Sequence, residues 1–165
     1  MPPPLFLSAW LDVDKPSLYR SFASKDDLAA AYMRDYDLDF WEKFENPGGK
    51  SYSDPREHVL AYIRVLSTRA VREGYRGCGL SNATVEYPSR DNPARQVAEA
   101  HKKVFRKRLR ELAAGMGARQ PAVLGDALLL LIEGIYSTGQ QSEEGPAQSA
   151  LAVAKLWIDA SVTKG

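Results

Sequence analysis

Residues 13–28 read VDKPSLYRSFASKDDL and carry the most specific local pattern in the chain. Leu18 and Phe22 are four residues apart, so they would share one face of a short helix. Ser24 is followed three residues later by Asp27, a spacing typical of a capped helix N-terminus. The stretch therefore predicts a short helix, a tight turn and a longer helix. Lys25 falls in the first turn of that longer helix, where backbone amides and the helix dipole favour an anion such as a phosphate.

The remainder of the chain carries further helix starts. The pairs Asp54-Pro55, Asn92-Pro93 and Gln120-Pro121 each place a polar residue before a proline, which suits the first helical position. Apolar residues then recur at helical spacing, and no segment alternates for long as a strand would. We therefore expect an all-α protein of about six helices. The expected ranges are 24–45, 54–74, 79–87, 93–116, 121–140 and 146–162.

Composition excludes several classes of protein. The chain has 165 residues and a formal net charge of +1, which excludes a uniformly basic protein that coats polyanions. The single cysteine, Cys78, cannot form an internal disulfide or a cysteine-based metal site, and we expect a neutral buried thiol there rather than a redox sensor. The longest purely apolar run, 127–132, is far shorter than the about 20 residues of a membrane span. With no basic segment before an apolar start, we expect a cytoplasmic protein without a membrane partner.

The pattern V-x-K-x-x-L-Y-x-x-F-x-S-K-x-x-L, matched from Val13 to Leu28, resembles TetR-like (TetR/AcrR) transcriptional regulators. It is similar to their recognition helix and the helix that follows. The resemblance implies a partial DNA-binding helix-turn-helix region at 1–45, with a recognition helix at about 15–22 and a linking helix at about 24–45. Residues 46–165 would then form a helical ligand-binding and dimerisation domain. By the same resemblance, the residues that contact DNA are Lys15, Pro16, Ser17, Tyr19 and, on a phosphate, Lys25.

The N-terminal region departs from the family pattern. Only 12 residues precede Val13, and three of them are prolines. Two helices of average length need about 22 residues. Residues 1–28 also have a net charge of −1, which provides little of the counterion release that drives DNA binding. We therefore expect a truncated or atypical helix-turn-helix, with operator DNA as a partner only if the N-terminus is extended or otherwise competent.

Two functions fit these observations. The first is a TetR-like repressor whose operator binding is relieved by a small, mostly apolar ligand in the helical domain. The alternative is a ligand-binding and dimerisation module that has lost DNA binding. The sequence contains no nucleophile–base arrangement, phosphate loop or metalloprotease motif, so we expect neither an enzyme nor a cofactor. His58 and His101 belong to different predicted helices and have no accompanying carboxylate cluster, so we expect no metal site.

The helical part of the chain also suggests a ligand pocket and a dimer interface. Polar groups embedded in apolar helix faces suggest a mostly apolar cavity, with Glu133 or Thr84 as the polar anchor. The last two predicted helices have apolar faces wider than a single stripe requires, which suggests a homodimer. The candidate pocket residues are Tyr62, Leu66, Thr84, Phe105, Glu133 and Tyr136. The candidate interface residues are Leu124, Leu128, Leu131, Ile135, Leu151, Trp157 and Ile158. The basic run at 101–110 has six Lys or Arg residues, and we expect it to be a solvated helix face.

Overall fold

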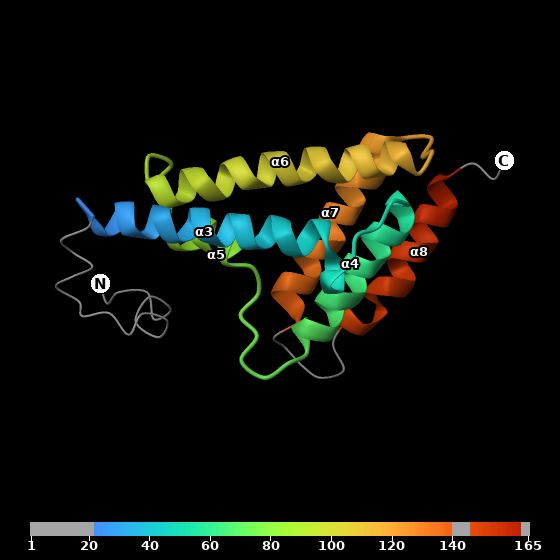
Figure 1. Ribbon diagram of the computed structural model, residues 1–165, viewed down its shortest axis with the longest axis horizontal. Coiled ribbons are helices and arrows are strands. Elements are labelled where there is room, and N and C mark those ends of the chain that lie inside the picture. The colour runs from blue at the N-terminus through green and yellow to red at the C-terminus, as the bar shows by residue number, and fades with distance from the viewer. Residues whose placement is uncertain (1–21, 140–145, 163–165) are drawn as a thin grey trace.

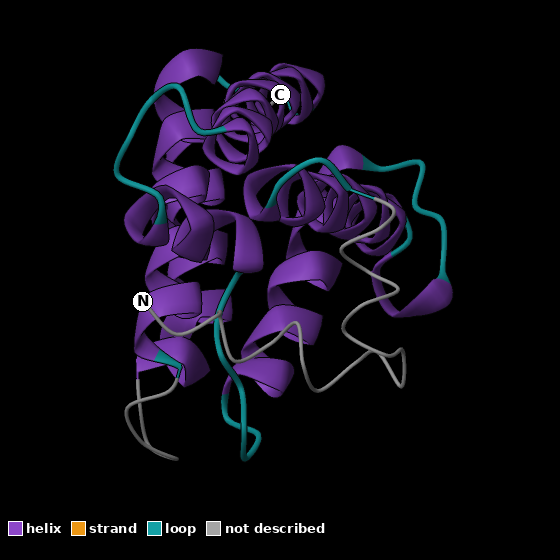
Figure 2. Ribbon diagram, turned by 90° about the vertical axis from the view of Figure 1, so that its left-hand side faces the viewer, coloured by secondary structure: helices purple, strands orange, loops and turns teal. Residues whose placement is uncertain are grey.

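The computed structural model describes residues 22–139 and 146–162, and within these ranges the fold is all-α (Figures 1 and 2). An isolated bridge between Ala118 and Val162 is the one β-type pairing there. Short 3-10 turns at Pro47–Gly49 and Pro146–Ser149 precede the helices that begin at Pro55 and Ala150. The α-helices are α3 (Lys25–Glu45), α4 (Pro55–Ala70), α5 (Gly79–Glu86), α6 (Pro93–Gly115), α7 (Pro121–Thr138) and α8 (Ala150–Ser161). The prediction of an all-α protein with these six helices is confirmed.

Side-chain caps explain why several helices begin where the sequence predicts. The hydroxyl of Ser24 accepts the backbone N–H of Asp27 at 3.1 Å. The carboxylate of Asp54 accepts the N–H of Arg56 at 2.8 Å, and Asn92 caps α6 in the same way. Each cap satisfies a backbone donor that the first helical turn leaves unpaired.

Figure 1 shows α3 and α6 side by side along the long axis, with α4, α7 and α8 grouped at one end. The crossing of α6 and α7 is close because Gly125 has no side chain. A Cβ atom there would lie 2.7 Å from backbone atoms of Arg110. At the far end of α7, a Cβ atom on Gly139 would lie 2.4 Å from that of Ala70, so α4 and α7 also approach closely. Glycines at these two positions let the helices share one core.

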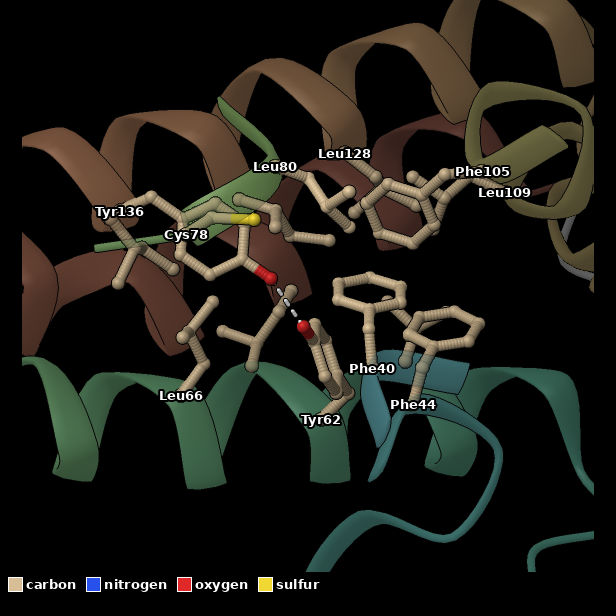
Figure 3. Close-up of a cluster of buried hydrophobic side chains, with 14 of the residues drawn as sticks. Phe40, Phe44, Tyr62, Leu66, Cys78, Leu80, Phe105, Leu109, Leu128 and Tyr136 are labelled. Atoms are coloured by element: carbon tan, nitrogen blue, oxygen red, sulfur yellow. Dashed lines mark hydrogen bonds between the residues drawn. The ribbon is translucent and has the colours of Figure 1, made fainter. Parts of the chain in front are cut away.

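The core contains a cluster of aromatic rings contributed by α3, α4 and α6 (Figure 3). Phe40 lies edge-on to Phe105 with ring centroids 5.0 Å apart, and Phe44 lies edge-on to Tyr62 at 4.8 Å. Such edge-to-face pairs add to the free energy gained by burying the rings. The C-terminal half of α3 therefore belongs to the same hydrophobic core as the helices that follow it.

The basic run of α6 contributes ion pairs to neighbouring helices. Both Arg106 and Arg110 bind the carboxylate of Asp126 on α7. Arg108 makes two hydrogen bonds of 2.8 Å to Glu45 on α3. This positive stripe therefore joins α6 to α3 and α7, whereas the sequence predicted only a solvated face.

Helix α7 is long and apolar enough by length and composition to cross a membrane. Leu128 and Ile132 are nevertheless fully buried within the protein, and Asp126 in the same helix pairs with two arginines of α6. These contacts make α7 a helix of the protein core rather than a membrane span.

Candidate ligand site and DNA-facing helix

A small cavity lies between α3, α4 and α7. Its volume is about 20 Å³, which is room for about one water molecule. Four aromatic residues, three charged residues and a glycine surround it, so the cavity has both aromatic and polar walls. The lining residues are Tyr36, Asp39, Phe40, Lys43, Tyr62, Arg69, Gly77 and Tyr136.

Two of these residues, Tyr62 and Tyr136, are hydrogen bonded to each other through their hydroxyl groups (Figure 3). Tyr62 comes from α4 and Tyr136 from α7, so the bond joins two helices across the core. Burial is the main reason that the pKa of each phenol lies above its ordinary value. Both phenols are therefore neutral at physiological pH, and each can offer a donor or an acceptor to a ligand that separates them.

Charged groups lie beside the aromatic walls. Asp39 and Lys43 form an ion pair one helical turn apart on α3. Burial raises the pKa of Tyr36 to about 12, while the nearby positive charge of Arg69 opposes that rise. The cavity is therefore lined by neutral phenols together with one carboxylate and two cations.

The structure brings together only part of the predicted pocket. Tyr62 and Tyr136 line the cavity, whereas Leu66 and Phe105 are buried in the core and do not line it. The two predicted polar anchors do not line it either. Glu133 accepts a hydrogen bond of 2.9 Å from Ser81 and pairs with Lys102.

The second anchor, Thr84, bonds within its own helix. Its hydroxyl donates to the carbonyl of Ser81 at 2.7 Å. Together with the Glu133 contacts, this bond belongs to a polar network that joins α5, α6 and α7. That network holds helices together at a place separate from the cavity.

Tyr36, Phe40 and Arg69 also line the cavity but are absent from the residues predicted from the sequence. A signal existed on α3, because Tyr36, Phe40 and Phe44 recur every four residues and so share one face. The resemblance assigns that helix to the DNA-binding region at 1–45 and not to the pocket. No sequence pattern around Arg69 indicates that it lines the cavity, because only the fold brings it there.

Solved structures with a similar fold point to one family. A TetR-family transcriptional regulator from Streptomyces coelicolor has a TM-score of 0.81 and 27% sequence identity to this chain, covering 92% of this chain and 80% of its own. A protein from Streptomyces avermitilis assigned to the TetR transcriptional regulators has a TM-score of 0.78 and 26% identity, covering 90% of this chain and 81% of its own. The chain is therefore similar in structure to TetR-family transcriptional regulators. No protein-family model and no curated protein matches the sequence.

This structural match agrees with the resemblance to TetR-like regulators that residues 13–28 suggest. Regulators of this family are DNA-binding transcription factors and not enzymes, as the sequence analysis expected.

The resemblance predicts that the DNA-binding end lies near the start of α3. Lys15, Pro16, Ser17 and Tyr19 lie outside the described residues. Lys25 is the first residue of α3 and is exposed. Asp26 and Asp27 follow it in the first turn and favour the helix, but they oppose an approaching phosphate.

The predicted dimer residues divide into two groups. Leu124, Leu128, Ile135 and Ile158 are buried inside the single protomer, so they are not available to a second copy. Leu131 and Leu151 are partly buried, and Trp157 is 39% exposed.

The exposed apolar surface of α7 and α8 comes mainly from other residues. Val123 and Leu130 on α7 and Leu156 on α8 are each more than 60% exposed. The sequence predicts the interface on α7 and α8, and both helices expose apolar side chains. Four of the seven predicted residues, however, are buried in the core, three on α7 and one on α8.

Proposed function

We propose that this TetR-family protein is a cytoplasmic, homodimeric repressor that releases operator DNA when a small, mostly apolar molecule enters the cavity between α3, α4 and α7. The observation that carries this proposal is the position of α3. The same helix contributes Tyr36 and Phe40 to the cavity and begins at Lys25. A ligand in the cavity would therefore touch the helix that leads to the DNA-binding end.

The length of α3 makes this coupling physically direct. Tyr36 lies eleven residues after Lys25 in one uninterrupted helix, which is about 16 Å at about 1.5 Å per residue. A helix of this length moves as a rod, so a small tilt at Tyr36 displaces Lys25. Because the cavity holds about one water molecule, a larger ligand has to displace α3 or separate Tyr62 from Tyr136. A ligand that fits only the displaced arrangement shifts the population away from the DNA-binding one.

The exposed surface of α7 and α8 supports the homodimer. Val123, Leu130, Leu156 and Trp157 are large apolar side chains exposed to solvent on two adjacent helices. A Cβ atom on Gly134 would meet nothing within 4 Å, so the surface there is open. Packing two such helix pairs together gives a four-helix arrangement with two-fold symmetry, which matches the symmetry of a palindromic operator.

Fluorescence anisotropy on DNA that flanks the gene tests the DNA-binding part of the proposal. A protein whose N-terminal helix-turn-helix is able to bind DNA is expected to bind tightly, and its affinity should fall steeply as the salt concentration rises. Lys25→Ala should weaken binding about equally for all sequences and reduce the salt slope by about 1, because the residue contacts a phosphate rather than a base. The exposed Lys50, after α3, provides a matched control, and Lys50→Ala should leave binding unchanged.

A thermal-shift screen with apolar small molecules tests the ligand part. A compound that stabilises the protein should also release bound DNA in the anisotropy assay. Ligand binding and dimerisation without any DNA binding would instead support the alternative function, a ligand-binding and dimerisation module that has lost DNA binding. Failure of every apolar compound to stabilise the protein would contradict the ligand site.

A further inference from the structure

Arg69 is unusual among the lysines and arginines that the structure describes. Lysines and arginines that are fully exposed need no partner, but partial burial of a cation without an opposite charge is unfavourable. Within residues 22–139 and 146–162, every partly buried lysine or arginine except Arg69 pairs with a carboxylate. These pairs are Arg56–Asp159, Arg95–Glu99, Lys102–Glu133, Arg108–Glu45 and Arg110–Asp126.

The position of Arg69 places its charge at the cavity. It belongs to the last turn of α4 and lines the cavity together with the aromatic residues. Its positive charge acts on the phenols of Tyr36, Tyr62 and Tyr75, where it partly offsets the rise in pKa caused by burial. In the part of the chain that the structure describes, the hydroxyl of Tyr75 is buried without a hydrogen-bond partner. An unused donor therefore lies close to an unpaired cation.

The charges of the other two ionised residues at the cavity sum to zero. Asp39 and Lys43 neutralise each other through their ion pair. The lining therefore has a net charge of +1, which Arg69 supplies. An uncharged ligand would leave this guanidinium unpaired and further desolvated, whereas an anionic ligand would pair with it.

We propose that the effector is an aromatic carboxylate, with its carboxylate bound by Arg69 and its ring held among Tyr36, Phe40 and Tyr136. This inference rests on the proposed function, because it uses the same cavity. A guanidinium matches the two oxygens of a carboxylate with two parallel hydrogen bonds. Aromatic walls favour a flat ring through stacked and edge-on contacts. A single cation suits a monoanion better than a phosphate dianion, which would need more positive charge.

The Tyr62–Tyr136 hydrogen bond would then respond to the same ligand. Since the cavity now has room for about one water molecule, the ring has to displace one of these side chains. A hydroxyl or carbonyl group on the ligand can replace the lost partner. Carboxylate binding at Arg69 on α4 and ring binding against α3 would therefore act on both helices at once.

Matched probes separate charge from shape. We would measure the binding of benzoate, 4-hydroxybenzoate and 1-naphthoate, each beside its uncharged primary amide, by calorimetry and thermal shift. The wild type is expected to bind at least one carboxylate about tenfold or more tightly than its amide, as charge-assisted hydrogen bonds imply. Arg69→Gln should remove this preference. Arg69→Lys should keep part of it, because lysine retains the charge but not the two-pronged geometry.

Arg72 provides the control, since it lies three residues further along the chain and is exposed. Arg72→Gln should keep the full preference for the carboxylate. Arg69→Gln without any probe should unfold close to the wild type, because the arginine has no carboxylate partner to lose among the described residues. A lower stability of this variant with an unchanged probe preference would show that Arg69 is structural, and would overturn the proposal.

Two further outcomes distinguish this proposal from the one on which it rests. Equal binding of carboxylates and amides by the wild type would overturn the anionic effector and leave the apolar ligand site intact. Absence of binding by both series, and by the neutral apolar compounds of the wider screen, would overturn the ligand site and this inference together.

Discussion

At the scale of single residues, the core of this protein contains polar groups that depend on one specific partner. Tyr62 and Tyr136 are hydrogen bonded in the interior, and His101 pairs with Asp37 at 2.6 Å beside Phe40 and Phe105. A buried polar group that loses its partner pays the full cost of desolvation, whereas removal of both partners can be nearly neutral. Two predictions follow from this asymmetry and from the burial of the histidine.

The tyrosine pair should show strong coupling. Tyr62→Phe or Tyr136→Phe alone should lower the free energy of unfolding by about 1–3 kcal/mol, because each leaves the other hydroxyl unpaired. The double variant should cost much less than the sum of the two single changes. Urea denaturation of all four proteins measures this coupling. Additive losses would mean that the two hydroxyls do not depend on each other.

His101 should make stability depend on pH. Burial lowers the pKa of His101 below its ordinary value of 6.5, against the opposing effect of Asp37. The unfolded chain therefore binds a proton near pH 6.5 before the folded protein does, so this contribution to stability is lost as pH falls below about 6.5. Urea midpoints measured from about pH 7.5 down to about pH 5.5 should fall for the wild type and fall less steeply for His101→Gln. An identical slope in both proteins would exclude this histidine as the cause.

At the scale of elements, α5 is a short helix that other elements hold in place. It has eight residues, far fewer than an isolated helix needs for stability in water. Arg95 on α6 donates to the carbonyls of Thr84, Tyr87 and Pro88 at 3.0–3.1 Å, at the C-terminal end of α5. One guanidinium therefore satisfies carbonyl groups that the helix end leaves unpaired.

Loss of this arginine should loosen α5 selectively. Arg95→Ala should raise amide hydrogen exchange across 79–86 and lower the free energy of unfolding by about 1–3 kcal/mol. The C-terminal half of α6 should stay protected, because its contacts with α3 and α7 do not involve Arg95. Exchange measured by mass spectrometry tests this, with Gln96→Ala at the exposed neighbouring position as the control. Unchanged exchange in α5 would show that its buried Leu80 and Ala83 hold it without the cap.

At the scale of the whole molecule, the two faces of α7 have different roles. One face packs into the protomer through Leu128 and Ile132. The other exposes Leu130, and Gly134 lies on open surface. The difference gives a test of the dimer that separates loss of association from loss of folding.

Leu130→Glu and Gly134→Arg should each yield a folded monomer. Both changes place a charge on the proposed interface, and neither removes a buried side chain. Leu128→Lys should instead unfold the protomer, because it buries an unpaired charge in the core. Sedimentation velocity at micromolar concentration together with circular dichroism measures both properties. A monomeric wild type would contradict the homodimer, and a folded monomer from Leu128→Lys would contradict the assignment of that face to the core.

The sequence by itself determined where the helices lie and indicated the TetR family, to whose solved structures the fold is similar. Ser24, Asp54 and Asn92 cap helices through side chains close to them in the chain, and Pro55 and Pro93 fit only the first turn. Such signals act within one helical turn, so they can be read without knowledge of the fold. The motif at 13–28 is local in the same sense.

Only the tertiary structure decided which face of each helix is buried and which residues meet at the cavity. Helix α7 is apolar on both faces, so its sequence could not show that Leu128 faces the core and Leu130 faces solvent. Tyr36 and Arg69 are far apart in the chain and meet only because α3 packs against α4. A helical repeat specifies that residues share a face, whereas the partner helix that covers this face depends on contacts distant in sequence.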